Sequence, residues 1–189
     1  AEGSGVVEVA AGEDTDRQAL QTAVAFAQAI KRQPVVCAES PGLIATRIAD
    51  DAKEIAGEAG ADDAGDLPLL LAACSVLEEG IATHRDIDLA LMRGADRLAP
   101  PFMTADTEGL DEVLTRIADA ESRWGAAFAA PSVLLRLVAQ GRLGKKAGQG
   151  FYPYARPDSE QVGEVVAVGT RGGVALAWPQ NPPMNARAP

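Results

Sequence analysis

Few side chains in this sequence could act as an acid, a base or a nucleophile near neutral pH. Histidine is the usual general base, because its pKa lies closest to neutral, and the chain contains one histidine, His84. It stands in the sequence THRDID, where Thr83 and Asp86 have the spacing of a helix N-cap. We therefore expect His84 to be a solvated residue at the start of a helix and not a catalytic base.

The two cysteines and a lysine pair do not form recognisable sites either. Cys37 and Cys74 lie in no CxxC motif and at no metal-binding spacing with histidine, which favours a reduced, cytoplasmic protein with no metal site. Lys145 and Lys146 could reach a phosphate, but they stand in a glycine-rich loop without the spacing of a phosphate-binding loop. GSGVVE at residues 3–8 lacks the third glycine of a dinucleotide-binding motif. We expect this chain to bind no cofactor by itself.

The composition favours a mainly α-helical protein. Apolar residues make up 47% of the chain and aromatic residues only 4%, which is typical of closely packed helices and not of a β-sandwich. The formal net charge of -10 disfavours nucleic acid and anionic membrane surfaces as partners. No apolar run reaches the roughly 18 residues of a membrane span, and the N-terminus lacks the order of a signal peptide.

Apolar spacing and capping residues predict a short strand at 6–9 and then mostly helices. We expect a brief extended run at 34–38 and helices at about 16–31, from 43 onward, and at 67–82, 83–92, 107–120 and 131–140. In the first helix, Leu20, Val24, Ala27 and Ile30 form an apolar stripe that should be buried.

Two of these segments have a composition that goes beyond a simple helix prediction. Residues 50–66 carry seven acids, one lysine and three glycines, and we interpret them as a flexible acidic insertion, because glycine weakens a helix by about 1 kcal/mol relative to alanine. The helices at 67–82 and 131–140 are so apolar that we expect the chain to self-associate, most simply as a homodimer.

The end of the chain has a different character. After Pro157, EVVAVGTRGGVALAW alternates small and β-branched residues around a glycine pair, which predicts a β-hairpin. We therefore divide the chain into a helical domain at 1–156, including the insertion at 50–66, and a linker with a hairpin at 157–189.

Four separated segments together resemble a known family. VVEVAAGEDTD, PVVCAESPGLIATRI, EEGIATHRDIDLALMRGA and LLRLVAQGRLGKKAGQGFYPY occur in the order found in 3-hydroxyacyl-CoA dehydrogenases, over about residues 5–154 outside the acidic insertion. The resemblance implies the helical C-terminal domain of that family, of the 6-phosphogluconate dehydrogenase C-terminal-like type. It also implies that this domain closes over the acyl chain and forms a dimer, whereas a separate Rossmann domain holds NAD.

The resemblance assigns two site residues. Glu8 stands where the family has a glutamate that orients and charges a catalytic histidine, and that histidine belongs to an upstream segment that this chain lacks. Thr46 stands where the family usually has an asparagine that hydrogen-bonds near the reacting carbonyl of the substrate. From the pattern alone, Glu8 would be an outward-facing strand residue and Thr46 a helical threonine bonded to its own backbone. The implied protein is an NAD-dependent dehydrogenase of fatty-acid β-oxidation, and the isolated chain is expected to be inactive.

Three alternatives remain open at this point. The segment VGTRGGVALAWPQNPPMNARAP resembles the opening of a crotonase-like enoyl-CoA hydratase domain, which implies a multifunctional enzyme, but it could also be an unstructured tail. Thr46 and the acidic insertion favour a non-catalytic helical dimerisation or scaffold domain within a multifunctional acyl-CoA protein. The helical domain of another 3-hydroxyacid dehydrogenase is a further alternative, which the GKKAGQGFY segment disfavours.

Overall fold

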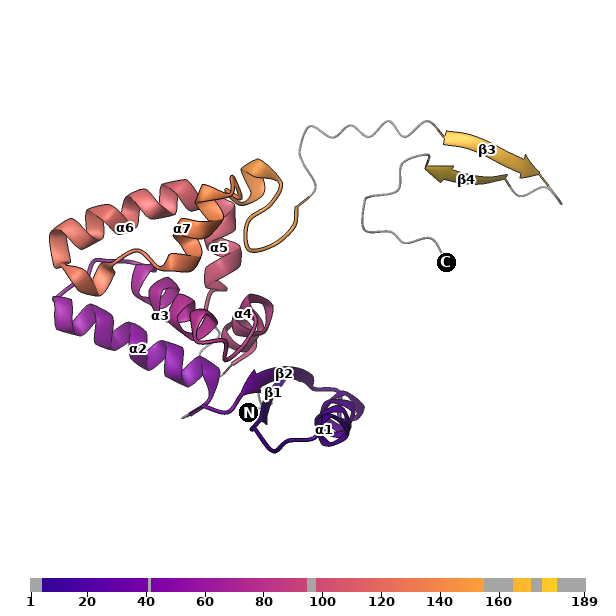
Figure 1. Ribbon diagram of the computed structural model, residues 1–189, viewed down its shortest axis with the longest axis horizontal. Helices are drawn as coiled ribbons and strands as arrows, with labels where there is room; N and C mark the ends of the chain where they lie inside the picture. The colour runs from indigo at the N-terminus through magenta and orange to yellow at the C-terminus, as the bar shows by residue number, and fades with distance from the viewer. Residues whose placement is uncertain (1–4, 41, 95–97, 155–164, 171–174, 180–189) are drawn as a thin grey trace. The chain divides into compact units, whose positions relative to one another are not determined.

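The computed structural model of the protein describes residues 5–40, 42–94, 98–154, 165–170 and 175–179. The chain divides into two units, Ala1–Arg156 and Pro157–Pro189. In the described residues, the first unit contains a parallel strand pair and the helices, and the second contains an antiparallel strand pair (Figure 1). The mainly α-helical class predicted from the composition is confirmed, and no described helix has the length and hydropathy needed to span a bilayer.

The first unit begins with a strand–helix–strand element. β1 (Val6–Ala11) and β2 (Gln33–Ala38) are parallel, with Glu8 opposite Val35, and α1 (Arg17–Ala29) connects them. Parallel neighbours cannot be joined by a tight turn, so a helical crossover is the expected connection. The sequence predicted the first strand and the extended run at 34–38, and the structure adds that the two are hydrogen-bonded to each other.

Apolar side chains of α1 and β2 are exposed on one side of this strand–helix–strand element. Ala27 is buried as predicted, but Ile30 is 48% exposed, and beside the predicted stripe Phe26 is 66% exposed. Val36 on β2 is 36% exposed. Burial of the whole α1 stripe was therefore a wrong prediction for this chain, because a two-stranded sheet offers too little surface to cover a helix.

In the residues that the structure describes, six further α-helices make up most of the remainder of the first unit. They are α2 (Ile44–Ala59), α3 (Leu67–Glu78), α4 (His84–Arg93), α5 (Pro101–Glu108), α6 (Leu110–Trp124) and α7 (Ser132–Ala139). α3 lies in the centre and packs against α2, α4 and α5 (Figure 1). Its residues Leu70, Ala73 and Val76 are at most 4% exposed, so the apolar sequence of this helix is covered within the unit and does not require a second chain.

Two predicted segments differ from the observed helices. The helix expected at 107–120 corresponds to α6, whereas α5 before it was not predicted. Gly109 separates the two helices with a φ of 115°, which glycine adopts without strain. The first part of the segment 50–66 continues α2 up to Gly60, and Ile55 packs against the core. Asp66, the last residue of the segment 50–66, accepts a 2.5 Å hydrogen bond from Arg116 of α6. The flexible insertion was thus a wrong interpretation, since the amphipathic spacing outweighs the cost of the glycines.

The second unit contains the predicted hairpin strands. β3 (Val165–Thr170) and β4 (Ala175–Pro179) are antiparallel, with a register irregularity between Ala167 and Thr170. The glycine turn between them and the segment NPPMNARAP lie outside the described residues. The resemblance of this tail to a hydratase domain stays a prediction.

Candidate functional site

The first turn of α2 is capped by a side chain from β1. Leu43, which precedes the helix, is extended and offers no side-chain cap. Instead, the backbone N–H of Ile44 donates a 2.9 Å hydrogen bond to Oε2 of Glu8. A carboxylate is favoured here, because the first N–H groups of a helix have no partner inside the helix and carry partial positive charge. Glu8 therefore joins the strand pair to the helical part of the unit.

The structure brings the two residues predicted for the site to the same turn of helix. Glu8 is half-buried and faces α2, so it is not the outward-facing residue that the strand pattern alone suggests. Its second oxygen, Oε1, has no hydrogen-bond donor in the described part of the chain. Thr46 is the third residue of α2, and its side chain is exposed. A carboxylate oxygen and a hydroxyl group are thus both available beside the start of α2.

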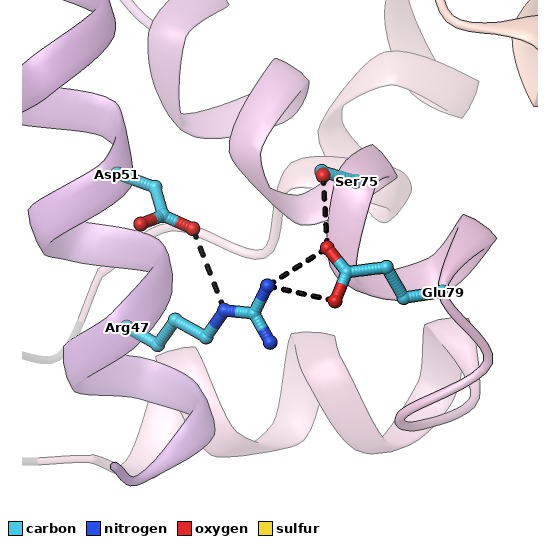
Figure 2. Close-up of polar contacts among 4 residues, drawn as sticks. All are labelled: Arg47, Asp51, Ser75 and Glu79. Atoms are coloured by element: carbon cyan, nitrogen blue, oxygen red, sulfur yellow. Dashed lines mark hydrogen bonds and ion pairs between the residues drawn. The ribbon is translucent and has the colours of Figure 1, made fainter. Parts of the chain in front are cut away.

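An ion pair fixes this turn of α2 against α3. Nη2 of Arg47, the residue after Thr46, donates to Oε1 and Oε2 of Glu79 at 2.7 and 2.8 Å (Figure 2). Ser75 donates to the same carboxylate at 3.2 Å, and Asp51 lies 3.6 Å from Nε of Arg47. The hydrogen bonds from Arg47 lower the pKa of Glu79. The side chain of Arg47 therefore fixes the turn of α2 that carries Thr46 against α3.

An open depression of about 680 Å³ lies beside β2 and the start of α4. Its lining is mostly apolar and includes Val36, Cys37, Leu77 and Ile81. Burial, followed by the negative charges of Glu8 and of an aspartate in α4, raises the pKa of the Cys37 thiol. Cys37 is thus held as a neutral thiol, which is a poor nucleophile, and it contributes apolar surface to the depression.

His84 has a different environment from the one predicted. It begins α4 after the predicted Thr83 cap, but its ring is half-buried and meets the ring of Tyr152 edge-on, with centroids 4.7 Å apart. The ring of Phe151 lies at 6.3 Å. Burial, and then the charge of Arg85, lowers the pKa of His84. The expected solvated position was wrong, because its aromatic neighbours come from a segment far along the chain.

Two buried aspartates missed by the sequence reasoning hold the C-terminal loop of the unit. Asp88 is 2% exposed and accepts from the backbone N–H groups of Phe102 and Met103 at 3.1 and 3.0 Å. The hydroxyl group of Tyr152 donates to it at 2.8 Å. Asp106, which is fully buried, accepts from the N–H groups of Phe151 and Tyr152, each at 2.9 Å, and from the hydroxyl group of Tyr154 at 3.0 Å. Asp88 directly follows the buried Ile87 and Asp106 directly follows the buried Ala105, and this apolar setting was the signal that could have identified them.

The glycines of this loop have a packing role. A Cβ on Gly144 would overlap the backbone of Asp106, and one on Gly150 would overlap the Asp106 carboxylate. Gly144 also has a φ of 88°, which side chains other than glycine rarely adopt. The GKKAGQGFY segment therefore fits around a buried carboxylate, and nothing in its geometry indicates a phosphate-binding loop.

The strand–helix–strand element does not fit the phosphates of a dinucleotide. In such elements, phosphates bind where the strands end and the helix begins. At that place Oδ1 of Asp16 accepts from the N–H groups of Gln18 and Ala19, at 2.6 and 2.9 Å, and so occupies the helix terminus. Glu13 and Asp14 add exposed negative charge beside it. This loop would repel a pyrophosphate.

The described residues of the first unit thus form a helical domain that follows a pair of parallel strands. The family described as "3-hydroxyacyl-CoA dehydrogenase, C-terminal domain" matches residues 67–154. Residues 67–154, which are fewer than half of the chain, are thus similar to this domain family. Glu8 and Thr46 lie outside this matched range.

Individual relatives agree with this assignment. The chain is 31% identical over 153 residues to a probable 3-hydroxyacyl-CoA dehydrogenase of Caenorhabditis elegans, covering 80% of this chain and 46% of that protein. It is 41% identical over 90 residues to a 3-hydroxybutyryl-CoA dehydrogenase of Mycobacterium tuberculosis, covering 47% of this chain and 31% of that protein. The chain spans about half or less of the length of the curated relatives it matches.

A solved structure shares the fold. The 3-hydroxyacyl-CoA dehydrogenase of Archaeoglobus fulgidus superimposes with a TM-score of 0.51 at 22% identity, covering 80% of this chain and 48% of that one. At this identity the likeness concerns the arrangement of the helices and strands and not their chemistry.

Proposed function

We propose that this chain is the substrate-binding half of an NAD-dependent 3-hydroxyacyl-CoA dehydrogenase of fatty-acid β-oxidation. The observation that carries the proposal is the position of Glu8 at the first turn of α2, next to Thr46. The match of residues 67–154 to the family supports it. NAD is then bound by a domain outside this chain, since the loop after β1 does not suit its phosphates. We place the protein in the cytosol, consistent with two free, buried cysteines.

Glu8 is assigned the task of orienting a histidine supplied by the rest of the protein. Oxidation of a 3-hydroxyl group requires a base for the hydroxyl proton, and imidazole serves when a carboxylate fixes its tautomer and stabilises its cationic form. Oε2 of Glu8 is held by the N–H of Ile44, which leaves Oε1 to accept a hydrogen bond from the imidazole N–H. This arrangement keeps the carboxylate in one orientation while the imidazole gains and loses its proton.

Thr46 and the open depression are assigned to the substrate. The exposed hydroxyl of Thr46 can donate one hydrogen bond to the carbonyl oxygen of an acyl-CoA, and the ion pair of Arg47 with Glu79 fixes the backbone that carries it. The apolar depression of about 680 Å³ beside β2 can accept an acyl chain. The side chain of threonine is shorter and stiffer at χ1 than that of asparagine, so this chain is expected to place the carbonyl closer to α2.

The first test separates the isolated chain from a reconstituted enzyme. The 189-residue chain alone should oxidise NADH with acetoacetyl-CoA no faster than a boiled control, because it offers neither a dinucleotide site nor the base. A fusion to the NAD-binding domain of an active, NAD-dependent 3-hydroxybutyryl-CoA dehydrogenase should oxidise NADH. Turnover by the chain alone would contradict the proposal, as would a folded fusion without turnover, which is the outcome that the scaffold alternative predicts.

The second test examines Glu8 within that fusion. Glu8→Gln should lower kcat by roughly 10² to 10⁴-fold with little change in KM, the range for loss of acid–base assistance. The matched control is Glu13→Gln, an exposed glutamate of the loop after β1. Thr46→Asn should retain activity, since it restores an amide donor. Equal kcat values for the Glu8 and Glu13 variants would remove Glu8 from the mechanism.

We also propose that the protein is a homodimer. The reason differs from the sequence argument, because α3 is covered within the unit. Exposed apolar side chains remain on α4, α5 and α7, where Met92, Met103 and Leu135 are 43%, 41% and 50% exposed. Such surface is often covered by a partner. Light scattering over a dilution series should give the mass of a dimer, and a monomer at every concentration would contradict this proposal.

A further inference from the structure

A second cavity, of about 420 Å³, lies on the helical part of the unit. Its walls are the end of α3, the start of α4, one face of α7 and the loop that follows α7. Apolar side chains form part of it, among them Leu77, Val133, Leu137 and Phe151. No residue of β1, β2 or α2 lines it, so it is separate from the first turn of α2, and it shares Leu77 and His84 with the depression of about 680 Å³ beside β2.

The polar lining of this cavity is basic, although the chain as a whole is acidic. Arg136 and Arg142 both line it, together with Gln140. The lining contains one carboxylate, Glu78, whose Oε1 accepts from the backbone N–H of Val133 at 2.6 Å and from a serine hydroxyl at 2.8 Å, so its orientation is fixed by neutral donors. Within the described ranges, neither arginine forms an ion pair. Two guanidinium groups thus line one cavity, and the single negative charge of Glu78 leaves this lining with an excess of positive charge.

Arg142 has a specific unsatisfied donor. Its Nη2 donates to the carbonyl oxygen of Gly150 at 2.5 Å, which fixes the side chain. Its Nε is buried and has no hydrogen-bond acceptor in the part of the chain that the structure describes. A buried, charged N–H without an acceptor is unfavourable, and native proteins normally satisfy it with water or a ligand. The planar guanidinium fork is suited to the paired oxygens of a carboxylate or phosphate.

We propose that this cavity binds a small organic oxyanion, whose charged end lies between Arg136 and Arg142 and whose apolar part lies against Leu137 and Phe151. The carboxamide of Gln140 supplies a neutral donor at the same wall. Oxyanions with two or three acceptor oxygens can engage both arginines at once, whereas a neutral ligand of the same shape leaves them unpaired. The class therefore comprises aryl or alkyl phosphates and carboxylates.

The electrostatics at His84, which also lines the cavity, agree with an anion site. Burial lowers the pKa of His84 most, followed by the charge of Arg85; Asp106 opposes this change, and the charge of Arg142 lowers the pKa by a smaller amount. A bound anion would counter the arginine charges and raise this pKa. Since His84 is the only histidine in the chain, its imidazole signals give an unambiguous reporter.

The test is a proton NMR titration of the 189-residue chain in phosphate-free buffer. Phenyl phosphate and phenylacetate are added in separate series. Inorganic phosphate serves as a control that has the anionic group alone, and benzyl alcohol as a control that has the apolar group without a charge. We expect saturable shifts of the His84 signals and a raised pKa with at least one of the two organic anions. Inorganic phosphate should bind more weakly, and benzyl alcohol should cause no saturable shift. The stronger of the two organic anions identifies the charged group that the site prefers.

Variants decide whether the two arginines form the site. Arg136→Gln and Arg142→Gln should each weaken binding of the preferred anion roughly tenfold or more, as expected for loss of a charge-assisted hydrogen bond. The matched control is Arg123→Gln, whose arginine pairs with Asp63 on another face and should not affect binding. Arg136 is exposed, so its variant stays informative if Arg142→Gln disturbs the loop.

Three results would overturn the proposal. These are no saturable shift with either organic anion, unchanged affinity in the Arg136 variant, and an equal loss of affinity in the Arg123 control. None of these measurements uses dehydrogenase activity, so the outcome is independent of the function proposed for Glu8 and Thr46.

Discussion

Replacing Asp106 by asparagine tests how the C-terminal loop is held to the helices. Oδ1 of Asp106 accepts from the N–H of Phe151, and Oδ2 accepts from the N–H of Tyr152 and the hydroxyl of Tyr154. An asparagine must place its NH₂ group at one of these two positions. In either orientation a backbone N–H loses its acceptor, whereas the tyrosine hydroxyl can rotate and accept instead.

The size of the effect follows from that geometry. A buried donor without an acceptor costs about 1–3 kcal/mol, and hydrogen bonds to a charged group are stronger than those to a neutral one. We therefore expect Asp106→Asn to lower the free energy of unfolding by roughly 2–4 kcal/mol, which is a large part of the 5–15 kcal/mol typical of a domain. The matched control is Asp119→Asn, an exposed position on α6 that should change stability by less than about 0.5 kcal/mol.

Urea unfolding followed by circular dichroism measures both variants. Hydrogen exchange should in addition show loss of protection at the N–H groups of Phe151 and Tyr152 before global unfolding. If Asp106→Asn is as stable as Asp119→Asn, and the two N–H groups stay protected, the buried carboxylate does not hold the loop and the reasoning is refuted.

Three further predictions address other parts of the first unit. Gly57 lies inside α2 with open space around its Cα, so Gly57→Ala should stabilise the protein by about 0.5–1 kcal/mol in the urea experiment. Gly150→Ala should destabilise it in the same experiment, because the Cβ of the new alanine would overlap the buried Asp106 carboxylate. Arg47 lowers the pKa of Glu79, so the ion pair stabilises the fold above the unfolded pKa of about 4.3 and this contribution is lost as pH falls through the lower folded value. Glu79→Gln should therefore cost less than about 1 kcal/mol at neutral pH and nothing in strong acid, and an equal cost at both would contradict the assignment. Burial and neighbouring cations also lower the pKa of His84, so NMR should place its midpoint below about 6.5, and stability should fall as pH drops through that midpoint.

The local elements were largely predictable from sequence, and their pairing was not. The apolar runs and capping residues placed α3, α4 and α7 close to their observed bounds. The parallel pairing of β1 with β2 was missed, because no local pattern states which strand a short apolar run will join. The glycines in the acidic segment were given too much weight against the amphipathic spacing, which continues α2 through Ile55.

The same division applies to the candidate site. Glu8 and Thr46 were proposed from the resemblance, and the structure places both at the first turn of α2. Strand alternation alone would have predicted that Glu8 faces solvent. The helix that it caps begins 36 residues later in the sequence, so no local pattern could have indicated this contact. The contacts of Asp88 and Asp106 could not be predicted from local sequence. The hydrogen-bond partners of Asp88 lie 14 to 64 residues away, and those of Asp106 lie 45 to 48 residues away.

The glycines around Asp106 also change what a sequence search can detect. GKKAGQGFY is the most specific segment of this chain, and at Gly144 and Gly150 there is no room for a Cβ beside Asp106. A search that depends on this segment therefore selects for a steric requirement of the architecture. It would retrieve chains that keep the helical scaffold after losing turnover as readily as working enzymes. Separating the two requires reading the residue that caps α2, where the proposed chemistry lies.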